Sequence, residues 1–335
     1  MNNSNRVIPL TCSGHTRPVV DLQFSPVTSD GNYYLISACK DGNPMLRDGI
    51  TGDWIGTFYG HKGAVWSARL TREAHRAVTG SADFSAKVWD TFSGEELHSF
   101  AHQHIVRAVD FSADGTRIVT GGKEQKLRIF DLYRPDAPPL EAEGHTGAIK
   151  AVAWDEKRHT ILSAGEDGCV RFWDLRTMRE IANIPCSGPV SSMALSVDGK
   201  YVTWASGKTA NFWNAESNNY EDITTHTLEK TVSSVSLHPD HTKFVAGSDS
   251  DLWAHSYDFE SGKELDVSKG HHGPIHTVSY SPDGEIYATG SAISIENERL
   301  QAELHDLDDF VDTPKVWKDK QRVMSHLSLE KSGIQ

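Results

Sequence analysis

The chain has 335 residues, 46 of them acidic and 33 lysine or arginine, which gives a formal net charge of −13 at pH 7. This acidic balance argues against general binding to nucleic-acid phosphates, although it leaves a local basic patch open. No stretch reaches the roughly 18 to 20 apolar residues of a membrane span, and the N-terminal segment lacks the apolar run of a signal peptide, so we expect a soluble intracellular protein.

The first predicted element is a strand over residues 7–12, directly before Gly14-His15. Short alternating apolar runs follow it, and the same arrangement returns at residues 60–90 and 144–174, each opening on Gly-His and closing on Trp-Asp. Apolar residues at every second position, interrupted by turn residues such as Asp-Gly, predict antiparallel strands joined by tight turns. One such unit cannot bury both faces of its small sheet, so it needs neighbours of the same kind.

Four polar side chains recur in these repeats: a His, a Ser or Thr 18 residues later, an Asp at 22 and a Trp at 28. A catalytic triad would occur once, whereas this set recurs with a Trp attached. We therefore predict a buried hydrogen-bond chain from the indole through the hydroxyl and the imidazole to the carboxylate, and we name the set a tetrad. Two repeats carry all four side chains: His61, Thr79, Asp83 and Trp89 in one, and His145, Ser163, Asp167 and Trp173 in the other.

A unit of about 40 to 45 residues running from Gly-His to Trp-Asp resembles the blade of a WD-repeat propeller. Seven blades of about 42 residues would use about 294 residues as one domain. We therefore expect an all-β, seven-bladed WD40 β-propeller over residues 7–295, with the strand at 7–12 pairing with the last repeat to close the ring.

Several repeats depart from the tetrad. Arg47 stands where the first repeat should have its Trp. The fifth repeat has Cys186 in the His place and closes on Trp213-Asn214, while the sixth closes on Tyr257-Asp258. The third repeat keeps the spacing with altered chemistry, through His102, Thr120, Glu124 and Phe130.

The seventh repeat begins normally but loses the pattern after Ser291. We predict a seventh blade that lacks its third strand, with residues 293–295 as a short replacement, and a tail over 296–335 that is helical or disordered. Apolar residues at helical spacing and Asn297 as N-cap predict a first helix, and Thr313-Pro314 a second, short one.

One rim of the predicted ring carries most of the candidate binding residues, because the His-bearing loops, the start of each innermost strand and the turn before each Asp lie there. A basic rim on an acidic protein would attract an acidic peptide or an RNA backbone, and the alternative is that these are ordinary surface residues. The candidate partner-binding residues are Arg17, Lys40, Lys62, Trp66, Arg107, Lys123 and Lys150.

Nothing in the sequence predicts catalysis. It has no phosphate-binding loop, nucleotide fingerprint or paired-carboxylate pattern, so we expect no cofactor and no small-molecule substrate. The four cysteines form no C-x-x-C pair and have no histidine at zinc-ligand spacing, so we expect reduced thiols and no metal site.

Specific segments carry a closer resemblance. PLTCSGHTRPVVDL, YYLISACKDGNPMLRDG and GHHGPIHTVSYSPDGEIYATGS, at residues 9–22, 33–49 and 270–291, resemble the serine-threonine kinase receptor-associated, or Unr-interacting, family. Arg47 belongs to that family's pattern. The resemblance implies a non-catalytic scaffold of the cytoplasm and nucleus. It would join gemin subunits of the survival-of-motor-neuron (SMN) complex in spliceosomal snRNP assembly and mRNA splicing, and would bind TGF-β receptors and inhibitory Smads to damp that signal.

A different class of function stays open. ILSAGEDGCVRFWDLR, residues 161–176, fits the box ending in WDxR that substrate receptors of cullin-RING ubiquitin ligases often carry. Because Trp173-Asp174 is common to blades, the added weight of this alternative rests on Arg176.

Overall fold

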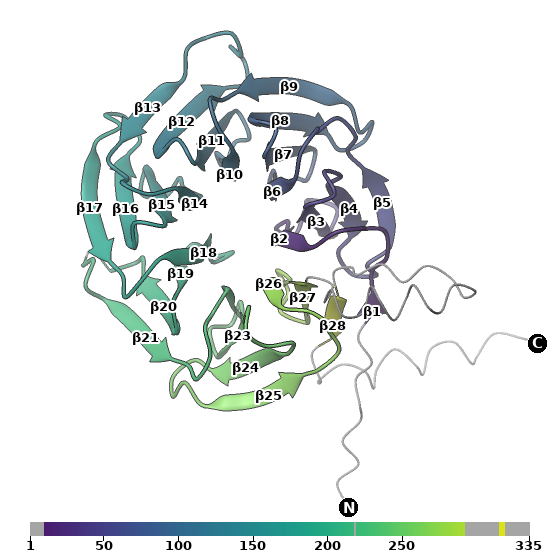
Figure 1. Ribbon diagram of the computed structural model, residues 1–335, viewed down its shortest axis with the longest axis vertical. Coiled ribbons are helices and arrows are strands. Elements are labelled where there is room, and N and C mark those ends of the chain that lie inside the picture. Colours follow the sequence, from purple (N-terminus) through teal and green to yellow (C-terminus); the bar gives the residue numbers. More distant parts are fainter. Residues whose placement is uncertain (1–9, 218, 292–314, 319–335) are drawn as a thin grey trace, which may run out of the picture.

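The computed structural model describes residues 10–217 and 219–291, and the backbone of the strand at 315–318. Seven four-stranded antiparallel sheets stand around a central channel, as Figure 1 shows. None of the residues in these ranges lies in a helix, so the predicted all-β propeller is confirmed. We number the sheets as blades one to seven in chain order, beginning with the blade of β2.

In each blade the strands run in order from the channel outward. Blades one to three contain β2 (Val19–Phe24), β3 (Tyr34–Cys39), β4 (Met45–Asp48) and β5 (Trp54–Thr57); β6 (Val65–Leu70), β7 (Arg76–Ser81), β8 (Ser85–Asp90) and β9 (Glu96–Ala101); and β10 (Val106–Phe111), β11 (Arg117–Gly122), β12 (Lys126–Asp131) and β13 (Leu140–Glu143). Blades four to six contain β14 (Ile149–Asp155), β15 (Thr160–Gly165), β16 (Cys169–Asp174) and β17 (Glu180–Pro185); β18 (Val190–Leu195), β19 (Tyr201–Ser206), β20 (Thr209–Asn214) and β21 (Ile223–Thr227); and β22 (Ser234–Leu237), β23 (Lys243–Gly247), β24 (Ala254–Asp258) and β25 (Glu264–Ser268).

Blade seven is assembled from separate segments: β26 (Ile275–Tyr280), β27 (Ile286–Ser291), β28 (Lys315–Lys318) and β1 (Leu10–Thr11). Its two outer strands are short, and β28 lies between β27 and β1. The short helix predicted from Thr313-Pro314 is therefore wrong over the four residues of β28. These residues instead form the strand that pairs with the backbone N–H and C=O groups of β27. The hydrogen bonds of this pairing favour the strand more than a weak helical spacing of apolar residues favours a helix. Residues 293–295 and the helix predicted at Asn297 lie outside the described ranges.

The core lies between blades, where apolar residues of neighbouring sheets interlock. Between blades one and two, for example, Ile36 and Leu46 pack with Val65, Ala68 and the fully buried Trp89. Every inner strand is therefore covered on both sides, which explains why the middle strands of each blade are almost continuously buried.

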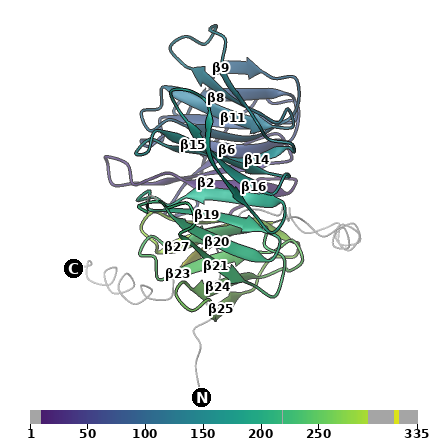
Figure 2. The same cartoon turned by 90° about the vertical axis from the view of Figure 1, so that its left-hand side faces the viewer.

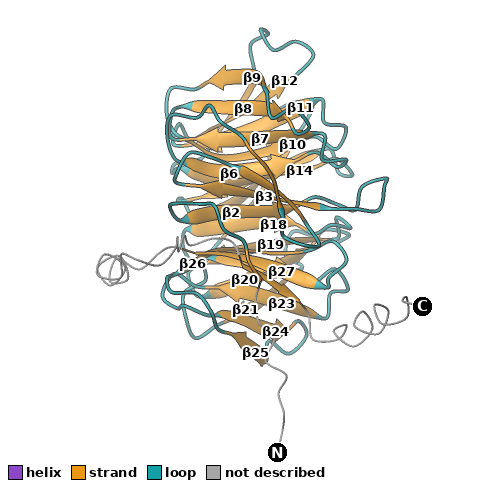
Figure 3. Ribbon diagram, turned by 90° about the vertical axis from the view of Figure 1, so that its right-hand side faces the viewer, coloured by secondary structure: helices purple, strands orange, loops and turns teal. Residues whose placement is uncertain are grey.

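Loops gather on two opposite faces of the ring, as the side views in Figures 2 and 3 show. Because successive strands are antiparallel, the loops that lead into the innermost strands share one face with the loops between second and third strands. We call this face the upper rim. The loops between first and second strands, and between third and fourth, form the lower rim.

A register shift marks the second residue of the innermost strand in every blade except blade six, where none is recorded. A bulge of this kind leaves one residue unpaired and re-aims its side chain. The bulge residues all lie at the upper end of the channel, which positions the candidate site.

Candidate functional site

The structure brings both predicted tetrads together inside their blades. In blade four, His145 Nδ1 lies 2.8 Å from Asp167 Oδ2 and Nε2 lies 2.6 Å from Ser163 Oγ, while Trp173 Nε1 donates to the same hydroxyl at 2.7 Å. Burial lowers the pKa of His145, so the neutral imidazole donates from Nδ1 and accepts at Nε2. The chain of four groups thus satisfies polar atoms buried within and beside the blade.

Blade two has the same geometry. His61 lies 2.8 Å from Asp83 and 2.7 Å from the Thr79 hydroxyl, which also accepts from Trp89 Nε1 at 2.8 Å. Burial alone would raise the pKa of Asp83, but hydrogen bonds from His61, the Ser85 hydroxyl and a backbone amide outweigh it and lower the pKa.

The repeats that lack a complete tetrad form different hydrogen bonds in its place. In blade one, Arg47 fills the Trp place and donates to backbone carbonyl groups of Gly52 and Ser13 instead of the hydroxyl. In blade three, His102 binds the Thr120 hydroxyl at 2.9 Å, but its other nitrogen faces the carbonyl of Phe100. Glu124 does not contact His102 and accepts instead from the amides of Gln103 and His104 and from Arg128.

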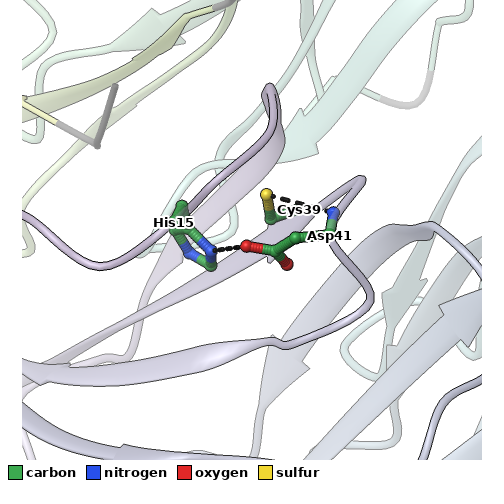
Figure 4. A group of neighbouring side chains, drawn as sticks. All are labelled: His15, Cys39 and Asp41. Carbon is green, nitrogen blue, oxygen red and sulfur yellow. Dashed lines mark hydrogen bonds and ion pairs between the residues drawn. The ribbon is translucent and has the colours of Figure 1, made fainter. Parts of the chain in front are cut away.

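Figure 4 shows the one group, among the residues that the structure describes, whose atoms lie as close as metal ligands do: His15, Cys39 and Asp41, with ligand atoms within 4.8 Å of one another. Each of these atoms is already used. His15 bonds to Asp41 at 2.9 Å and to Ser37 at 2.7 Å, and the Cys39 thiol donates to the Arg17 carbonyl at 2.9 Å. Burial raises the pKa of Cys39, which keeps the thiol protonated. The group therefore fits a tetrad chain with a neighbouring thiol, and not a metal centre.

The central channel forms a cavity of about 680 Å³. Its upper mouth is lined by one residue from each blade, at the second position of the innermost strand or its equivalent. These seven mouth residues are Val20, Trp66, Arg107, Lys150, Ser191, Ser233 and His276.

Hydrogen-bond donors without acceptors gather on one side of this mouth. The Arg107 guanidinium lies 4.3 Å from the centre of the Trp66 ring and the Lys40 ammonium lies 5.4 Å from it. The buried Trp66 Nε1 has no hydrogen-bond partner. Over the described ranges, no acceptor or carboxylate pairs with Lys40, Arg107 or the His276 ring. Buried polar groups are nearly always satisfied, so the unpaired indole N–H of Trp66 beside two cations indicates that an acceptor-rich ligand completes the site.

Burial shapes the charge of this cluster. Burial lowers the pKa of Arg107, and the negative charge of Glu166 offsets part of this decrease. The guanidinium still stays charged at neutral pH. Burial, with the nearby Lys40 charge, also lowers the pKa of His276, so this imidazole is neutral at pH 7. The mouth therefore presents fixed positive charge from Lys40 and Arg107, joined by Lys150, whose ammonium lies 3.5 Å from Glu166.

The structure separates the predicted rim residues into two groups. Lys40, Trp66, Arg107 and Lys150 line the channel mouth. Exposed residues of the upper-rim loops, away from the channel lining, make up the second group: Arg17, Lys62 and Lys123. The sequence analysis missed His276, Ser191 and Ser233, although a signal was present, because each follows the first core residue of its innermost strand as Trp66 does.

Deeper in the channel, charged residues connect neighbouring innermost strands. Arg69 bonds to Asp21 at 2.5 Å, and Asp110 accepts from the Trp154 amide at 2.8 Å. Burial raises the pKa of Asp110 to about 6, an effect that the Arg69 charge partly offsets.

We expect stability to fall as the pH rises from about 4 to about 6, through the titration of Asp110. Its pKa in the folded protein, about 6, exceeds the ordinary 3.8, so the folded state binds the proton more tightly and loses that advantage as the pH rises. Asp110→Asn should remove this part of the slope and keep the acceptor for the Trp154 amide. Urea midpoints of both proteins between pH 4 and 7 measure it, and parallel curves would contradict the assignment.

No helix long and apolar enough to cross a membrane occurs in the part of the chain that the structure describes.

Comparison with known proteins identifies the repeats. The family model described as WD domain, G-beta repeat, matches residues 52–90, 94–131, 138–174, 220–253 and 262–292. The serine-threonine kinase receptor-associated protein of Gallus gallus is 52% identical over 286 residues, which cover 85% of this chain and 80% of the relative.

Less similar relatives match a similar share of this chain. The protein of the same name from Dictyostelium discoideum is 48% identical over 284 residues, or 84% of this chain and 95% of the relative. The eukaryotic translation initiation factor 3 subunit I of Culex quinquefasciatus is 29% identical over 311 residues, covering 84% of this chain and 93% of the relative. The chain therefore belongs to the WD-repeat proteins and, among them, to the serine-threonine kinase receptor-associated protein family.

Proposed function

We propose that this chain is a non-catalytic scaffold that binds an acidic segment of a partner protein at the upper mouth of its channel. The observation that carries the proposal is the cluster of unpaired donors around Trp66, in which Lys40 and Arg107 hold positive charge beside a buried indole N–H. Carboxylates supply both the acceptors and the opposite charge that this cluster lacks.

A peptide fits this mouth better than an RNA backbone does. The basic side chains of the mouth come from blades one, three and four, while blades five and six contribute Ser191, Ser233 and the acidic Asp249. Single-stranded nucleic acid needs a continuous positive path with several stacking surfaces, whereas one or two carboxylate side chains can enter a short positive arc. Direct RNA binding would show itself as a steep fall of affinity with salt.

The names of the relatives suggest which proteins the partners are. Relatives are named for association with a serine-threonine kinase receptor, and we propose such a receptor, with inhibitory Smads in TGF-β signalling, as one partner class. Gemin subunits of the SMN complex, acting in spliceosomal snRNP assembly, are the second class, which rests on the resemblance of the repeats. The proposed location is the cytoplasm and also the nucleus.

Charge reversal at the mouth tests the proposal. We expect the triple variant Lys40→Glu, Arg107→Glu and Lys150→Glu to bind a fluorescein-labelled glutamate-rich decapeptide at least about 30-fold more weakly than the parent, because it reverses the field at the site. Fluorescence anisotropy at constant salt measures this.

The matched control reverses three exposed cations of the same rim, Arg17→Glu, Lys62→Glu and Lys123→Glu, with the same change in net charge. This variant should change the affinity less than about threefold, since screened surface charges act weakly. Equal losses in both variants would show a nonspecific charge effect and contradict a site at the mouth. Capture of purified gemin subunits and of a receptor kinase domain by the same variants would then rank the two partner classes.

The alternative of a substrate receptor for a cullin-RING ubiquitin ligase has one supporting observation. Arg176 is exposed on the turn between β16 and β17, at the lower rim, while Trp173 of the same WDxR box is committed to its tetrad. Loss of ligase-adaptor capture by Arg176→Ala, with decapeptide binding unchanged, would favour this second function.

A further inference from the structure

Blade six lacks the polar chain that fills blades two and four. The strand register places Ala246 where blade two has Thr79, and Tyr257 where it has Trp89. Leu228, four residues before the first buried residue of the inner segment, takes the His place. Apolar groups thus replace the imidazole and the hydroxyl, and a smaller ring replaces the indole.

A cavity of about 200 Å³ lies where these replacements occur. Leu228, Ala246 and the Tyr257 ring supply apolar walls, while Glu229, Lys230, His255 and Glu264 supply polar ones. An apolar cavity of about 150 Å³ is large enough for a benzene ring, so this space can take a side chain of moderate size.

Asp251 stands in the Asp place of the tetrad, but it contacts other residues than a tetrad histidine. It forms an ion pair with Lys230 and accepts from His255 Nε2 at 2.8 Å. The other His255 nitrogen lies 3.0 Å from Glu264. Of the five charged or titratable groups here, three are carboxylates, Glu229 included, against Lys230 and His255. The pocket therefore keeps a net negative charge even when His255 is protonated.

The surroundings of Tyr257 indicate which chemical groups a ligand of this pocket would need. The Tyr257 ring is stacked on Phe244, with centroids 5.2 Å apart, and the residue lines the pocket. No hydrogen bond between residues in the described ranges uses this hydroxyl. Burial and then the charges of Glu264, Glu229 and Asp251 raise its pKa to about 12, so a neutral phenol sits among carboxylates.

We propose that blade six holds a binding pocket for a guanidinium group on an aliphatic stem, that is, an arginine side chain inserted by a partner protein. Leu228 and Ala246 would contact the methylene groups. The planar guanidinium would donate to Glu264 and to the Tyr257 oxygen.

Other ligands satisfy the pocket less well. An anion would meet a net negative charge. A neutral aromatic ring would fill the apolar part but would leave the carboxylates without a donor. An ammonium ion offers the charge but lacks the flat fork of donors that reaches two oxygens at once. This pocket is separate from the channel mouth, where the charge has the opposite sign, so the two proposals stand or fail independently.

Titration of the full chain with n-butylguanidinium, followed by ¹H–¹⁵N NMR, tests the pocket. We expect saturable shifts confined to residues around Ala246 and Tyr257, with a Kd in the roughly millimolar range for a ligand of this size. Resonances near His61 and His145, whose blades hold complete tetrads, serve as the internal reference and should not move.

Two kinds of variant decide the assignment. Ala246→Thr with Tyr257→Trp restores the hydroxyl and the larger indole ring at two walls of the pocket, which should weaken binding at least about tenfold, because less room remains for the ligand. If this variant does not fold, Tyr257→Trp fills the same space with one substitution. Glu264→Gln leaves the shape intact and should weaken binding about threefold or more.

Three results would overturn the proposal: no saturable shift in the parent, unchanged binding in the filled variants, or equal binding of n-butylammonium or n-butyrate. Binding of n-butylguanidinium that is lost on filling and reduced by Glu264→Gln supports it. Decapeptide binding at the channel mouth should be the same in all these variants, which separates this test from that of the proposed function.

Discussion

A chain ended after Pro314 is expected to unfold at a much lower urea concentration than one ended after Lys318. The two chains differ by the four residues of β28, which form four residue pairs with β27 and two with β1, six in total. At about 1 kcal/mol net for each hydrogen bond of the ladder, the loss is roughly 4 to 6 kcal/mol. A propeller domain has about 5 to 15 kcal/mol of total stability, so the shorter chain should be marginal or unfolded.

The chain ended after Lys318 is the control, because it lacks residues 319–335 but keeps the strand. It should match the full chain within about 1 kcal/mol in the free energy of unfolding. The shorter chain also exposes the backbone edge of β27, so it should form aggregates that light scattering detects. Equal urea midpoints for the two truncated chains would show that β28 does not close the ring.

The sequence predicted the propeller because its evidence is local and repeated. Residues 60–90 and 144–174 repeat the same spacing, and any ring of such units must bury the tetrads. Blade seven was harder. Its third strand comes from Lys315–Lys318, more than twenty residues beyond β27, and its four residues fit a helical spacing as well as a strand. The strand is favoured because β27 needs a neighbour for its backbone N–H and C=O groups. This requirement cannot be read from the local sequence around residues 315–318.

The channel mouth was predicted in part. Spacing placed Lys40, Trp66, Arg107 and Lys150 on the correct rim, but it could not tell how far each side chain lies from the channel axis. The bulge in the innermost strand sets that distance, and it brings Trp66 and Arg107 into the mouth while Lys62 stays on an outer loop.

The pocket in blade six could not be predicted, because a change of register hides it. Ala246 precedes Tyr257 by eleven residues, whereas Thr79 precedes Trp89 by ten, so the extra residue lies in the loop before β24. Counting back from Tyr257 finds the Asp251 carboxylate but misplaces the hydroxyl position. The three-dimensional register was needed to see that two polar members of the tetrad are missing.

Thr79→Val is expected to destabilise the protein by about 2 to 4 kcal/mol, roughly twice the cost of Thr120→Val. Both threonines are fully buried and bind a histidine Nε2, at 2.7 Å in blade two and 2.9 Å in blade three. The substitution keeps the shape and replaces only the hydroxyl. In blade three it leaves the His102 nitrogen unpaired, and in blade two it leaves both the His61 nitrogen and the Trp89 indole N–H unpaired.

The difference between the two variants therefore isolates the indole N–H, because Phe130 of blade three has nothing to donate. Each buried group left without a partner costs about 1 to 3 kcal/mol, so the difference in the free energy of unfolding should fall in that range. Urea denaturation of both variants measures it. Adding Trp89→Phe to Thr79→Val removes the orphaned donor, so the two changes should cost less together than the sum of the single variants. Equal costs for Thr79→Val and Thr120→Val, or strictly additive costs in the double variant, would mean that the indole contributes packing alone, and that a tetrad is held together by its imidazole and carboxylate.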